Sequence, residues 1–314
     1  MPAAVAIIGS INMDVVAHVR TVPAAGQTVH GEALHLSPGG KGANQAVAAA
    51  QLGARVQMLG RVGDDAFGPV LLAGLSGAGV GTEAVLPVGG GVSSGTAVIL
   101  VEGSGQNRIV VNAGANGCLR EADVLAFEPV LRQCDVCLLQ LETPLASVAA
   151  AVALCRRLGV RVVLDAAPVP PEPPGREILG VDVLSPNLGE AAALLGVECP
   201  AETLEQAERL GRLLLASSGA GSVVVKAGSA GAVWVEPGRV RVQRALRVEV
   251  VDTTAAGDAF TAGLAVGLGE GLEASAALLR ACAAGALACT RRGAQEAMPG
   301  HDEVVLLLSR DGGG

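Results

Sequence analysis

The stretch VDTTAAGDAF, residues 251–260, places a carboxylate, Asp258, directly after two alanines and a glycine. The residues that follow, TAGLAVGL, have the composition of a buried helix, so a helix is predicted to open within 256–258. The free N–H groups and positive dipole end of such a helix attract anions, and small residues before it let an anion approach the main chain. A first-turn acidic residue also stabilises a helix on its own, so both interpretations stay open here.

Outward from this stretch, short apolar runs alternate with Ala- and Leu-rich segments of helical character. The runs are nearly continuous in apolar residues, as strands covered on both faces are, and they occupy 5–9, 136–140, 160–165, 181–186 and 222–228. Helices are expected at 42–52, 65–77, 122–133, 145–158, 189–195 and 203–217. The alternation predicts an α/β fold with a doubly wound, mainly parallel sheet flanked by helices.

Two segments interrupt this alternation, within about 13–40 and 93–113. Each is predicted to form a hairpin, because extended stretches are joined there by Gly- and Asn-containing turns. We expect their strands to form a small β-sheet lid over the mouth of the main sheet, since binding and closure often use such excursions. Edge strands of the main sheet are the alternative. No repeat or low-complexity linker divides the chain, so a single domain is expected over 1–314.

Composition excludes several classes of protein. A net charge of −8 and an isoelectric point near 5.1 argue against a nucleic-acid-binding protein. The longest uncharged stretch, 84–101, contains Pro87 and several glycines, so no membrane span is expected. Seven scattered cysteines are typical of a reduced, cytoplasmic protein. Cys134 and Cys137 form a C-x-x-C pair, for which the sequence offers no partner residues.

The commonest nucleotide and hydrolase motifs are missing from the sequence. HLSPGGKG has His35 and Gly42 where a Walker A loop requires glycine and a hydroxyl residue. No G-x-G carries a third glycine at the spacing of a dinucleotide-binding fold. GVSSG (91–95) matches G-x-S-x-G, but a strand rather than a helix is predicted after it. The four histidines form no zinc motif.

Two further stretches suggest phosphoryl transfer. SPGGKGANQ (37–45) runs from a Gly-Gly turn into a helix that carries Asn44. Asn187 and Glu190 lie three apart at a strand end and helix start, where they could hold Mg²⁺ or could simply cap the helix. A carboxylate beside an anion site makes chemical sense if it meets a hydroxyl that attacks the anion. Asp258 would then be a general base, and the helix start would stabilise the transferring phosphoryl group.

Together these stretches resemble the ribokinase family of carbohydrate kinases, also called the phosphofructokinase-B family, over nearly the whole chain. Both long family signatures are matched in order, with the N-x-x-E between them. The matching residues are Gly39, Gly40, Asn44, Ala46, Gly53 and Gly63 in the first signature, and Asp252, Thr253, Ala255, Ala256, Gly257, Asp258, Ala262 and Gly263 in the second.

Within the family, the segments GSINMD (9–14), GGKGANQA (39–46), NAGAN (112–116) and LQLETP (139–144) are similar to those of ribose-phosphorylating members. The resemblance implies transfer of the ATP γ-phosphoryl group to the 5-hydroxyl of D-ribose, with Asp258 as base and the Ala255, Ala256 and Gly257 backbone in the anion hole. It implies sugar contacts by Asn12, Asp14, Gly40, Lys41, Asn44, Glu142 and Asp258. The simpler alternatives are a turn cap for Asn12, a solvated Lys41 and a helix cap for Glu142.

The resemblance also assigns the ATP and cation sites. It implies ATP contacts by Asn187, Lys226, Gly228 and Gly257, and Mg²⁺ held through Asn187 and Glu190. A monovalent cation, usually K⁺, would be bound by Asp252, Thr254, Ala288, Arg291 and Gly293. Three residues depart from the usual pattern: Ala297 lacks a hydroxyl, Lys226 replaces a common threonine, and Asp165 replaces a common asparagine.

Two alternatives to ribose phosphorylation remain at this stage. One is a kinase of the same family for deoxyribose, fructose or adenosine. The other is a non-catalytic sugar- or nucleotide-binding regulator on a kinase scaffold, although the chain retains Asp258, Gly257, Asn187 and Glu190. The family resemblance further implies a homodimer that pairs the lid sheets of two copies, which would cover their exposed edges.

Overall fold

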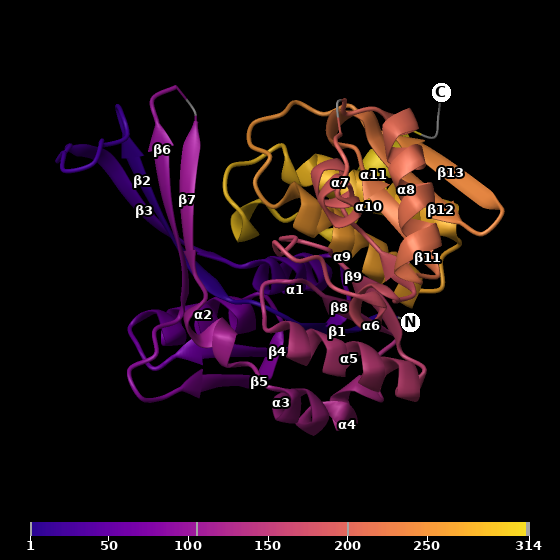
Figure 1. Ribbon diagram of the computed structural model, residues 1–314, viewed down its shortest axis with the longest axis horizontal. Helices are drawn as coiled ribbons and strands as arrows, with labels where there is room; N and C mark the ends of the chain where they lie inside the picture. The colour runs from indigo at the N-terminus through magenta and orange to yellow at the C-terminus, as the bar shows by residue number, and fades with distance from the viewer. Residues whose placement is uncertain (1, 105, 200, 312–314) are drawn as a thin grey trace.

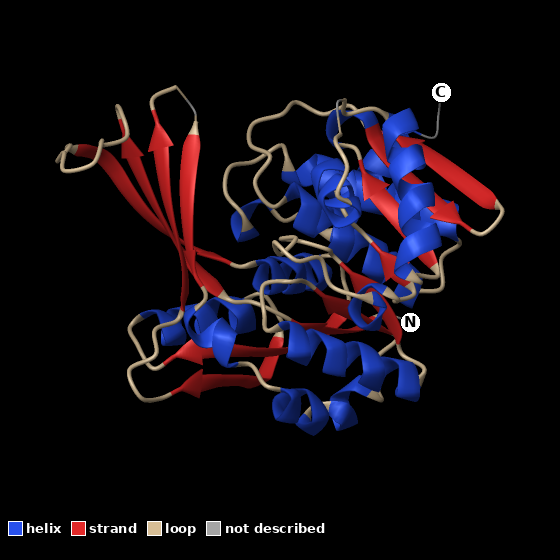
Figure 2. Ribbon diagram, in the orientation of Figure 1, coloured by secondary structure: helices blue, strands red, loops and turns tan. Residues whose placement is uncertain are grey.

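The main sheet runs through the centre of the protein (Figure 2). The computed structural model describes residues 2–104, 106–199 and 201–311, and within them this sheet has nine strands in the order β13-β12-β11-β10-β9-β8-β1-β4-β5. Neighbours from β11 to β5 pair in parallel, whereas β12 and β13 add an antiparallel edge. The strands are β1 (Ala4–Ile8), β4 (Arg55–Gly63), β5 (Gly81–Val88), β8 (Val136–Leu139), β9 (Arg161–Leu164), β10 (Val183–Leu184), β11 (Ser222–Lys226), β12 (Gly231–Glu236) and β13 (Arg239–Arg244).

Helices cover both faces of this sheet. One buried apolar cluster joins the sheet to α1 (Lys41–Gln51), α2 (Phe67–Gly77), α9 (Ala256–Gly269), α10 (Ala274–Ala288) and α11 (His301–Asp311). A second cluster, on the other face, includes α3 (Glu121–Ala126), α4 (Glu128–Leu131), α5 (Leu145–Leu158), α6 (Arg176–Leu179), α7 (Leu188–Leu195) and α8 (Leu204–Ser218). Strand β1 explains the apolar runs, because Val5 and Ile7 belong to the first cluster and Ile8 to the second.

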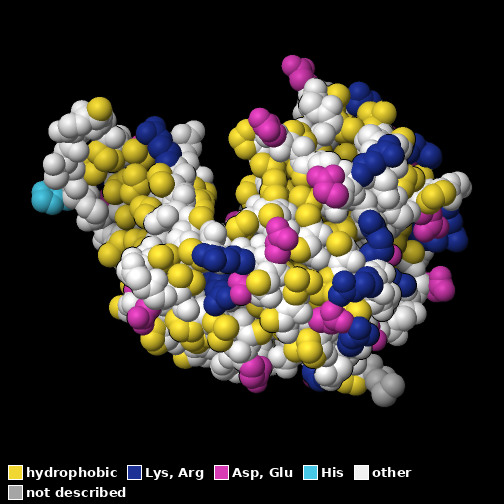
Figure 3. Space-filling model, turned by 60° about the horizontal axis from the view of Figure 1, so that its bottom comes forward, with side chains coloured by type: hydrophobic (Ala, Val, Ile, Leu, Met, Phe, Trp, Pro, Cys, Tyr) yellow, Lys and Arg dark blue, Asp and Glu magenta, His cyan; other side chains and the backbone are white. Residues whose placement is uncertain are grey.

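A small second sheet stands apart from the main one at the left of Figure 1. Its strands are β2 (Asn12–Val19), β3 (Gly31–Gly39), β6 (Gly95–Glu102) and β7 (Asn107–Asn112), in the order β3-β2-β6-β7. Each predicted hairpin is an antiparallel pair, and β2 pairs in parallel with β6 to join the two hairpins. Figure 3 shows an open hollow between this sheet and the rest of the molecule.

The predicted fold class is therefore confirmed: a mostly parallel sheet between helices, with a separate small sheet. Two element predictions were incomplete. The helix expected at 122–133 is divided into α3 and α4, with Pro129 in the first turn of the second helix, where its missing N–H costs nothing. Strands β4, β5, β12 and β13 were missed; polar residues interrupt the apolar runs of β4, β5 and β13, whereas the apolar run of β12 is short and continuous.

Helix α1 docks closely on the turn between β1 and β2. Ala43 N donates to Ser10 O (2.9 Å), and Gly42 N donates to Ser10 Oγ (3.2 Å). A Cβ added to Gly42 would lie 2.6 Å from the backbone N of Ser10 and 2.7 Å from the carbonyl carbon of Gly9. Only glycine permits this approach, and the approach sets where the following helical residues point.

We predict that Gly42→Ala destabilises the protein by about 1–3 kcal/mol, because overlap with backbone outweighs the better helix propensity of alanine. Gly77→Ala at the end of α2 is the matched control, since an added Cβ there meets no atom within 4 Å. The control should be neutral or stabilise the fold by up to about 1 kcal/mol. Urea unfolding measures both, and equal effects would contradict the close-approach explanation.

Candidate active site

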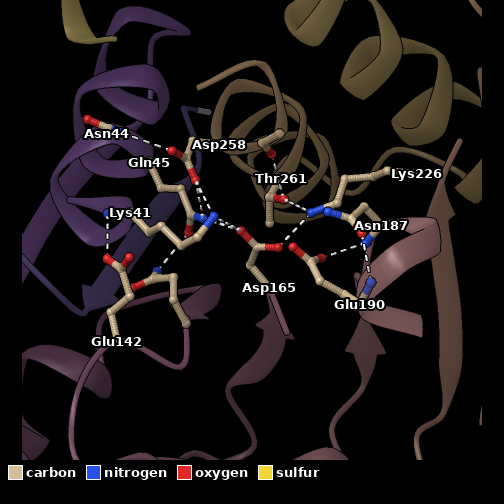
Figure 4. A network of polar contacts seen from close by, with 12 residues as sticks. Lys41, Asn44, Gln45, Glu142, Asp165, Asn187, Glu190, Lys226, Asp258 and Thr261 are labelled. Carbon is tan, nitrogen blue, oxygen red and sulfur yellow. Dashed lines mark hydrogen bonds and ion pairs between the residues drawn. The ribbon is translucent and has the colours of Figure 1, made fainter. Parts of the chain in front are cut away.

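The carboxylate of Asp258 lies buried in the first turn of α9, at the carboxyl ends of the parallel strands. Two amides of α1 hold it: Asn44 Nδ2 donates to Oδ2 (2.9 Å), and Gln45 Nε2 donates to Oδ1 (3.1 Å). Figure 4 shows α1 and α9 meeting through these contacts. Ala255, which precedes the helix, has a left-handed backbone with φ 56°, an uncommon conformation for a residue with a side chain.

Lys41, at the start of α1, points toward two carboxylates rather than into solvent. Its Nζ lies 3.8 Å from Asp258 Oδ1 and 3.9 Å from Asp165 Oδ2. Burial alone would lower the pKa of Lys41, but Asp258, Asp165 and then Glu142 raise it above its usual range. The side chain therefore carries a fixed positive charge beside Asp258.

The side chains expected to contact a sugar are held by neighbours and are not free caps. Glu142 Oε2 accepts from Ser10 Oγ (2.5 Å) and from Lys41 N (3.1 Å), so it ties the β8 end to the α1 start. Asn12 Oδ1 accepts from Asn116 Nδ2 (2.7 Å). The structure thus replaces the capping alternatives for Asn12 and Glu142 with long-range contacts.

The Gly40 turn and the Asp14 carboxyl group belong to the same set of residues expected to contact the sugar. Gly40 has φ 87°, and an added Cβ would lie 2.8 Å from Asn12 N, so the turn requires glycine. Asp14 lies on β2, and burial followed by the charges of Glu142, Asp258 and Glu296 raises the pKa of Asp14 to about 6. Three acidic side chains therefore act on Asp14 from three other parts of the fold.

The start of α9 offers backbone N–H groups without side chains in the way. Ala255 and Ala256 are half-buried, and Gly257 is exposed. A cavity of about 960 Å³ opens beside this turn, lined among others by Ala256, Gly257, Gly228 and Lys226. A volume of this size accommodates a nucleotide. A second cavity of about 800 Å³ lies at the opposite strand ends, beside Asp135, Arg161 and Asp182, and contains none of the expected site residues.

Asn187 and Glu190 form a reciprocal cap at the start of α7. Asn187 Oδ1 accepts from Glu190 N (2.8 Å), and Glu190 Oε2 accepts from Asn187 N (2.7 Å). Burial raises the pKa of Glu190, while Lys226 partly offsets that rise. Among the described residues no group of three His, Cys, Asp or Glu side chains is arranged to hold a metal ion. Hard oxygen donors still suit Mg²⁺, which usually keeps several waters and binds substrate phosphates.

The loop of Asp252 is joined to the segment after α10. Asp252 Oδ1 accepts from Thr254 N (3.0 Å) and Oγ1 (2.7 Å), and Oδ2 accepts from Gly293 N (3.0 Å). Burial would raise the pKa of Asp252, but these hydrogen bonds lower it, so the carboxylate stays charged. An anionic oxygen group suits an alkali cation. Ala288 ends α10, the Arg291 side chain pairs with Glu303, and Ala297 is fully buried.

Sequence reasoning missed Gln45 and Asn116 as site residues and left the role of Asp165 open. Gln45 bonds Asp258 and Asp165, while Asn116 also accepts from Ile11 N (2.9 Å) and donates to Ile11 O (3.1 Å). A signal for Gln45 was available, because residues 41, 44 and 45 share one face of a helix. Nothing local in the sequence marks Asn116 as the partner of Asn12, 104 residues away.

The model of the pfkB family of carbohydrate kinases matches residues 2–300. The chain belongs to the pfkB family. A ribokinase of Bacillus subtilis is 39% identical, covering 97% of this chain and 99% of the relative, and a deoxyribokinase of Salmonella typhimurium is 33% identical, covering 97% and 98%. The structure of Arabidopsis thaliana ribokinase complexed with ribose and ATP has a TM-score of 0.89 at 33% identity, covering 98% of this chain and 99% of that one.

The family match and the kinases among these relatives make the protein an enzyme. In the described part of the chain, no helix is long and apolar enough to cross a membrane. The C-x-x-C pair consists of free thiols. Burial raises the pKa of Cys134 to about 11, and a hydrogen bond with Cys155, followed by burial, raises the pKa of Cys137 well above its ordinary value, which makes both thiols unreactive at neutral pH.

We predict that Asp14 makes the stability of the protein fall as the pH rises from about 4 to about 6. The folded state keeps the Asp14 proton up to about pH 6, whereas the unfolded state loses it near 3.8, so the unfolded state binds fewer protons in this window. The two-unit difference corresponds to at most about 3 kcal/mol.

Denaturant unfolding of the wild type and of Asp14→Asn at pH 4, 5, 6 and 7 measures this contribution. As the pH rises through this window, the free energy of unfolding of the wild type should fall relative to that of Asp14→Asn. Parallel curves for the two proteins would show that Asp14 does not titrate in this way.

Proposed function

We propose that this protein is a ribose kinase that transfers the γ-phosphoryl group of ATP to the 5-hydroxyl of D-ribose and releases ribose 5-phosphate and ADP. One observation carries the proposal: the buried Asp258 carboxylate, fixed by Asn44 and Gln45, lies in the first turn of the helix whose start faces the 960 Å³ cavity. A base and an anion site are thereby combined in one turn.

In this mechanism the sugar lies between the small sheet and α1, with its reacting hydroxyl toward Asp258. Asp258 takes the proton of that hydroxyl as the oxygen attacks the γ-phosphorus, and the N–H groups from Ala255 to Asp258 stabilise charge on the transferring group. Lys41, 3.8 Å from Asp258, balances the carboxylate. The sugar-binding set is Asn12, Asp14, Gly40, Lys41, Asn44, Glu142 and Asp258.

We assign the ATP site to the cavity beside α9, which Lys226, Gly228 and Gly257 line, and we expect a further contact from Asn187 at the start of α7. Asn187 and Glu190 would hold Mg²⁺ through water, and the ion would neutralise phosphate charge. We assign a K⁺ site to Asp252 and Thr254, together with the backbone of Ala288, Arg291 and Gly293, which the hydrogen bond from Gly293 N to Asp252 supports. Buried Ala297 offers no hydroxyl there, so fewer ligands are available to the cation.

Deoxyribose is the strongest alternative substrate, because a deoxyribokinase is 33% identical to this chain. The two sugars differ by one hydroxyl. A site built to hydrogen-bond a hydroxyl rejects the analogue that lacks it, since buried polar groups are then left unpaired. The choice between the sugars thus depends on whether one of the sugar-facing side chains is matched to the 2-hydroxyl.

We predict that Asp258→Ala lowers ribose-dependent ADP release by about 10²–10⁴ while the protein stays folded. Asp302→Ala is the matched control, because Asp302 is an exposed acidic residue in the first turn of α11 and loses only a helix-dipole contact. A coupled ADP assay with ATP and Mg²⁺ measures both proteins.

The same assay run on ribose, deoxyribose, fructose and adenosine, with and without K⁺, tests substrate and cation. Turnover on another sugar would keep the mechanism and change the substrate. Full activity of Asp258→Ala on ribose would refute the base assignment. Equal rates with and without K⁺ would argue against the monovalent cation site.

We further propose that the small sheet acts as a lid and pairs with its counterpart in a second copy of a single-domain chain. On the face opposite Asp14, three exposed apolar residues form a row: Leu36, Val98 and Val110. The strand register places them side by side, because Val15 pairs with both Leu36 and Val98, and Val98 pairs with Val110. Exposed apolar sheet faces and edges are covered in stable proteins. Seven unpaired cysteines support a cytoplasmic location.

We predict that Leu36→Lys combined with Val110→Lys shifts the protein from dimer to monomer in light scattering at micromolar concentration. Each substitution would bury a charge in the proposed interface. Val242→Lys on β13, a substitution at another exposed apolar residue, is the control and should leave the mass unchanged. A wild type that is monomeric would contradict the proposed assembly directly.

A further inference from the structure

Lys226 and Asp165, both departures from the family pattern, form one ion pair. Lys226 Nζ lies 2.6 Å from Asp165 Oδ1, and Asp165 is fully buried. Asp165 follows β9 and Lys226 ends β11, so the pair spans the end of the intervening strand β10. A buried carboxylate is costly without a partner, and here the Lys226 ammonium is the nearer of two, since Lys41 Nζ lies 3.9 Å from Asp165 Oδ2.

The ammonium of this pair lies at the start of α9, beside the proposed anion hole. Lys226 Nζ is 3.4 Å from Thr261 Oγ1, whose hydroxyl donates to Gly257 O (2.9 Å). A Cβ added to Gly257 would lie 4.0 Å from Lys226 Nζ. Lys226 also lines the 960 Å³ cavity. A full positive charge thus adds to the partial positive charge of the helix end.

The carboxylate of the pair is connected to the base. Gln45 Nε2 donates to Asp165 Oδ2 (2.8 Å) and to Asp258 Oδ1 (3.1 Å), so one amide bridges the two carboxylates. Figure 4 shows the resulting row from Asp258 through Gln45 and Asp165 to Lys226. Gln45 is itself fixed, because Gln140 Nε2 donates to its Oε1 (2.7 Å).

We propose that Asp165 is a positioning residue that holds the Lys226 ammonium against the phosphates of ATP at the start of α9. Lys226 in turn compensates the Asp165 charge, which would otherwise repel those phosphates. The inference rests on the proposed kinase function, and it adds a role for Asp165 that the family pattern does not assign.

The two charges therefore belong together, and their removal is non-additive. Lys226→Met leaves a buried carboxylate facing the triphosphate, which combines lost attraction with new repulsion. Asp165→Asn keeps the Lys226 ammonium but removes the carboxylate that holds it in position. The double variant removes both charges and leaves no unpaired buried charge, which is the milder change for a buried ion pair.

A double-mutant cycle on ATP binding tests the pair. Calorimetry on the wild type, Asp165→Asn, Lys226→Met and the double variant gives four dissociation constants with ATP and Mg²⁺. We expect Lys226→Met to weaken ATP binding about tenfold or more, and the double variant to bind ATP more tightly than Lys226→Met does. The dissociation constant for ribose should stay within about threefold in all four proteins, a result that general loss of structure would not give.

Three further single variants serve as controls for this interpretation. Glu208→Gln and Arg212→Met remove an exposed ion pair on α8 and should leave ATP binding unchanged, singly and together. If Asp165→Asn fails to fold, Lys226→Arg replaces it in the test. This variant keeps a positive charge beside Asp165 and should bind ATP at least about fivefold more tightly than Lys226→Met.

Additive effects of Asp165→Asn and Lys226→Met on ATP binding would overturn the proposal, as would equal binding by Lys226→Arg and Lys226→Met. Ribose-dependent ADP release by the wild type is measured beside the cycle. A wild type that binds ATP but phosphorylates no ribose would refute the proposed function, while the binding cycle would still decide the role of Asp165. A wild type that binds no ATP would refute both.

Discussion

The hydrogen bonds from α1 to the carboxylate of Asp258 are the constraint on which the rest of the site depends. Asn44 and Gln45 reach Asp258 only because α1 docks closely on the turn after β1, where Gly42 has no room for a side chain. The same docking places the Lys41 ammonium beside Asp258, and it lets the Lys41 backbone N–H donate to Glu142. A carboxylate this buried requires such donors, since unpaired charge in a low-dielectric interior is strongly disfavoured.

Local pattern predicted the fold class because buried strands read as short continuous apolar runs and helices as longer Ala- and Leu-rich segments. The start of α9 was predicted from the composition of the residues that follow it. Contacts between distant segments could not be predicted from the sequence, since they depend on the order of the strands in the sheet. The Lys226–Asp165 pair exists because β9 and β11 flank β10, and no spacing in the sequence reveals that neighbourhood. Asn187 and Glu190 show the opposite case, where a local motif correctly indicated a cap but left its metal role undecided.

The low content of aromatic residues affects how the core is packed. With only 1% aromatic residues, the core relies on close approach of small side chains. Gly263 of α9 illustrates this, because an added Cβ would lie 3.0 Å from the Cβ of Ala284 and 3.2 Å from the Cα of Ala281 in α10. Helix α9 is thereby held between α1 and α10, so the position of its first turn is set by backbone contacts along its length rather than by one anchoring side chain.

The small sheet is joined to the site through the chain itself as well as through the Asn12–Asn116 hydrogen bond. Strand β2 begins at Asn12 and β3 ends at Gly39, one residue before the Gly40 turn and two before Lys41. Four of the residues proposed to bind the sugar thus lie on β2 or directly after β3: Asn12, Asp14, Gly40 and Lys41. Any displacement of the sheet carries Asn12 and Asp14 with it and pulls on the start of α1. In the proposed function, sugar binding and the position of the sheet are therefore coupled, and the partner copy proposed for this sheet would also fix the shape of the proposed sugar site.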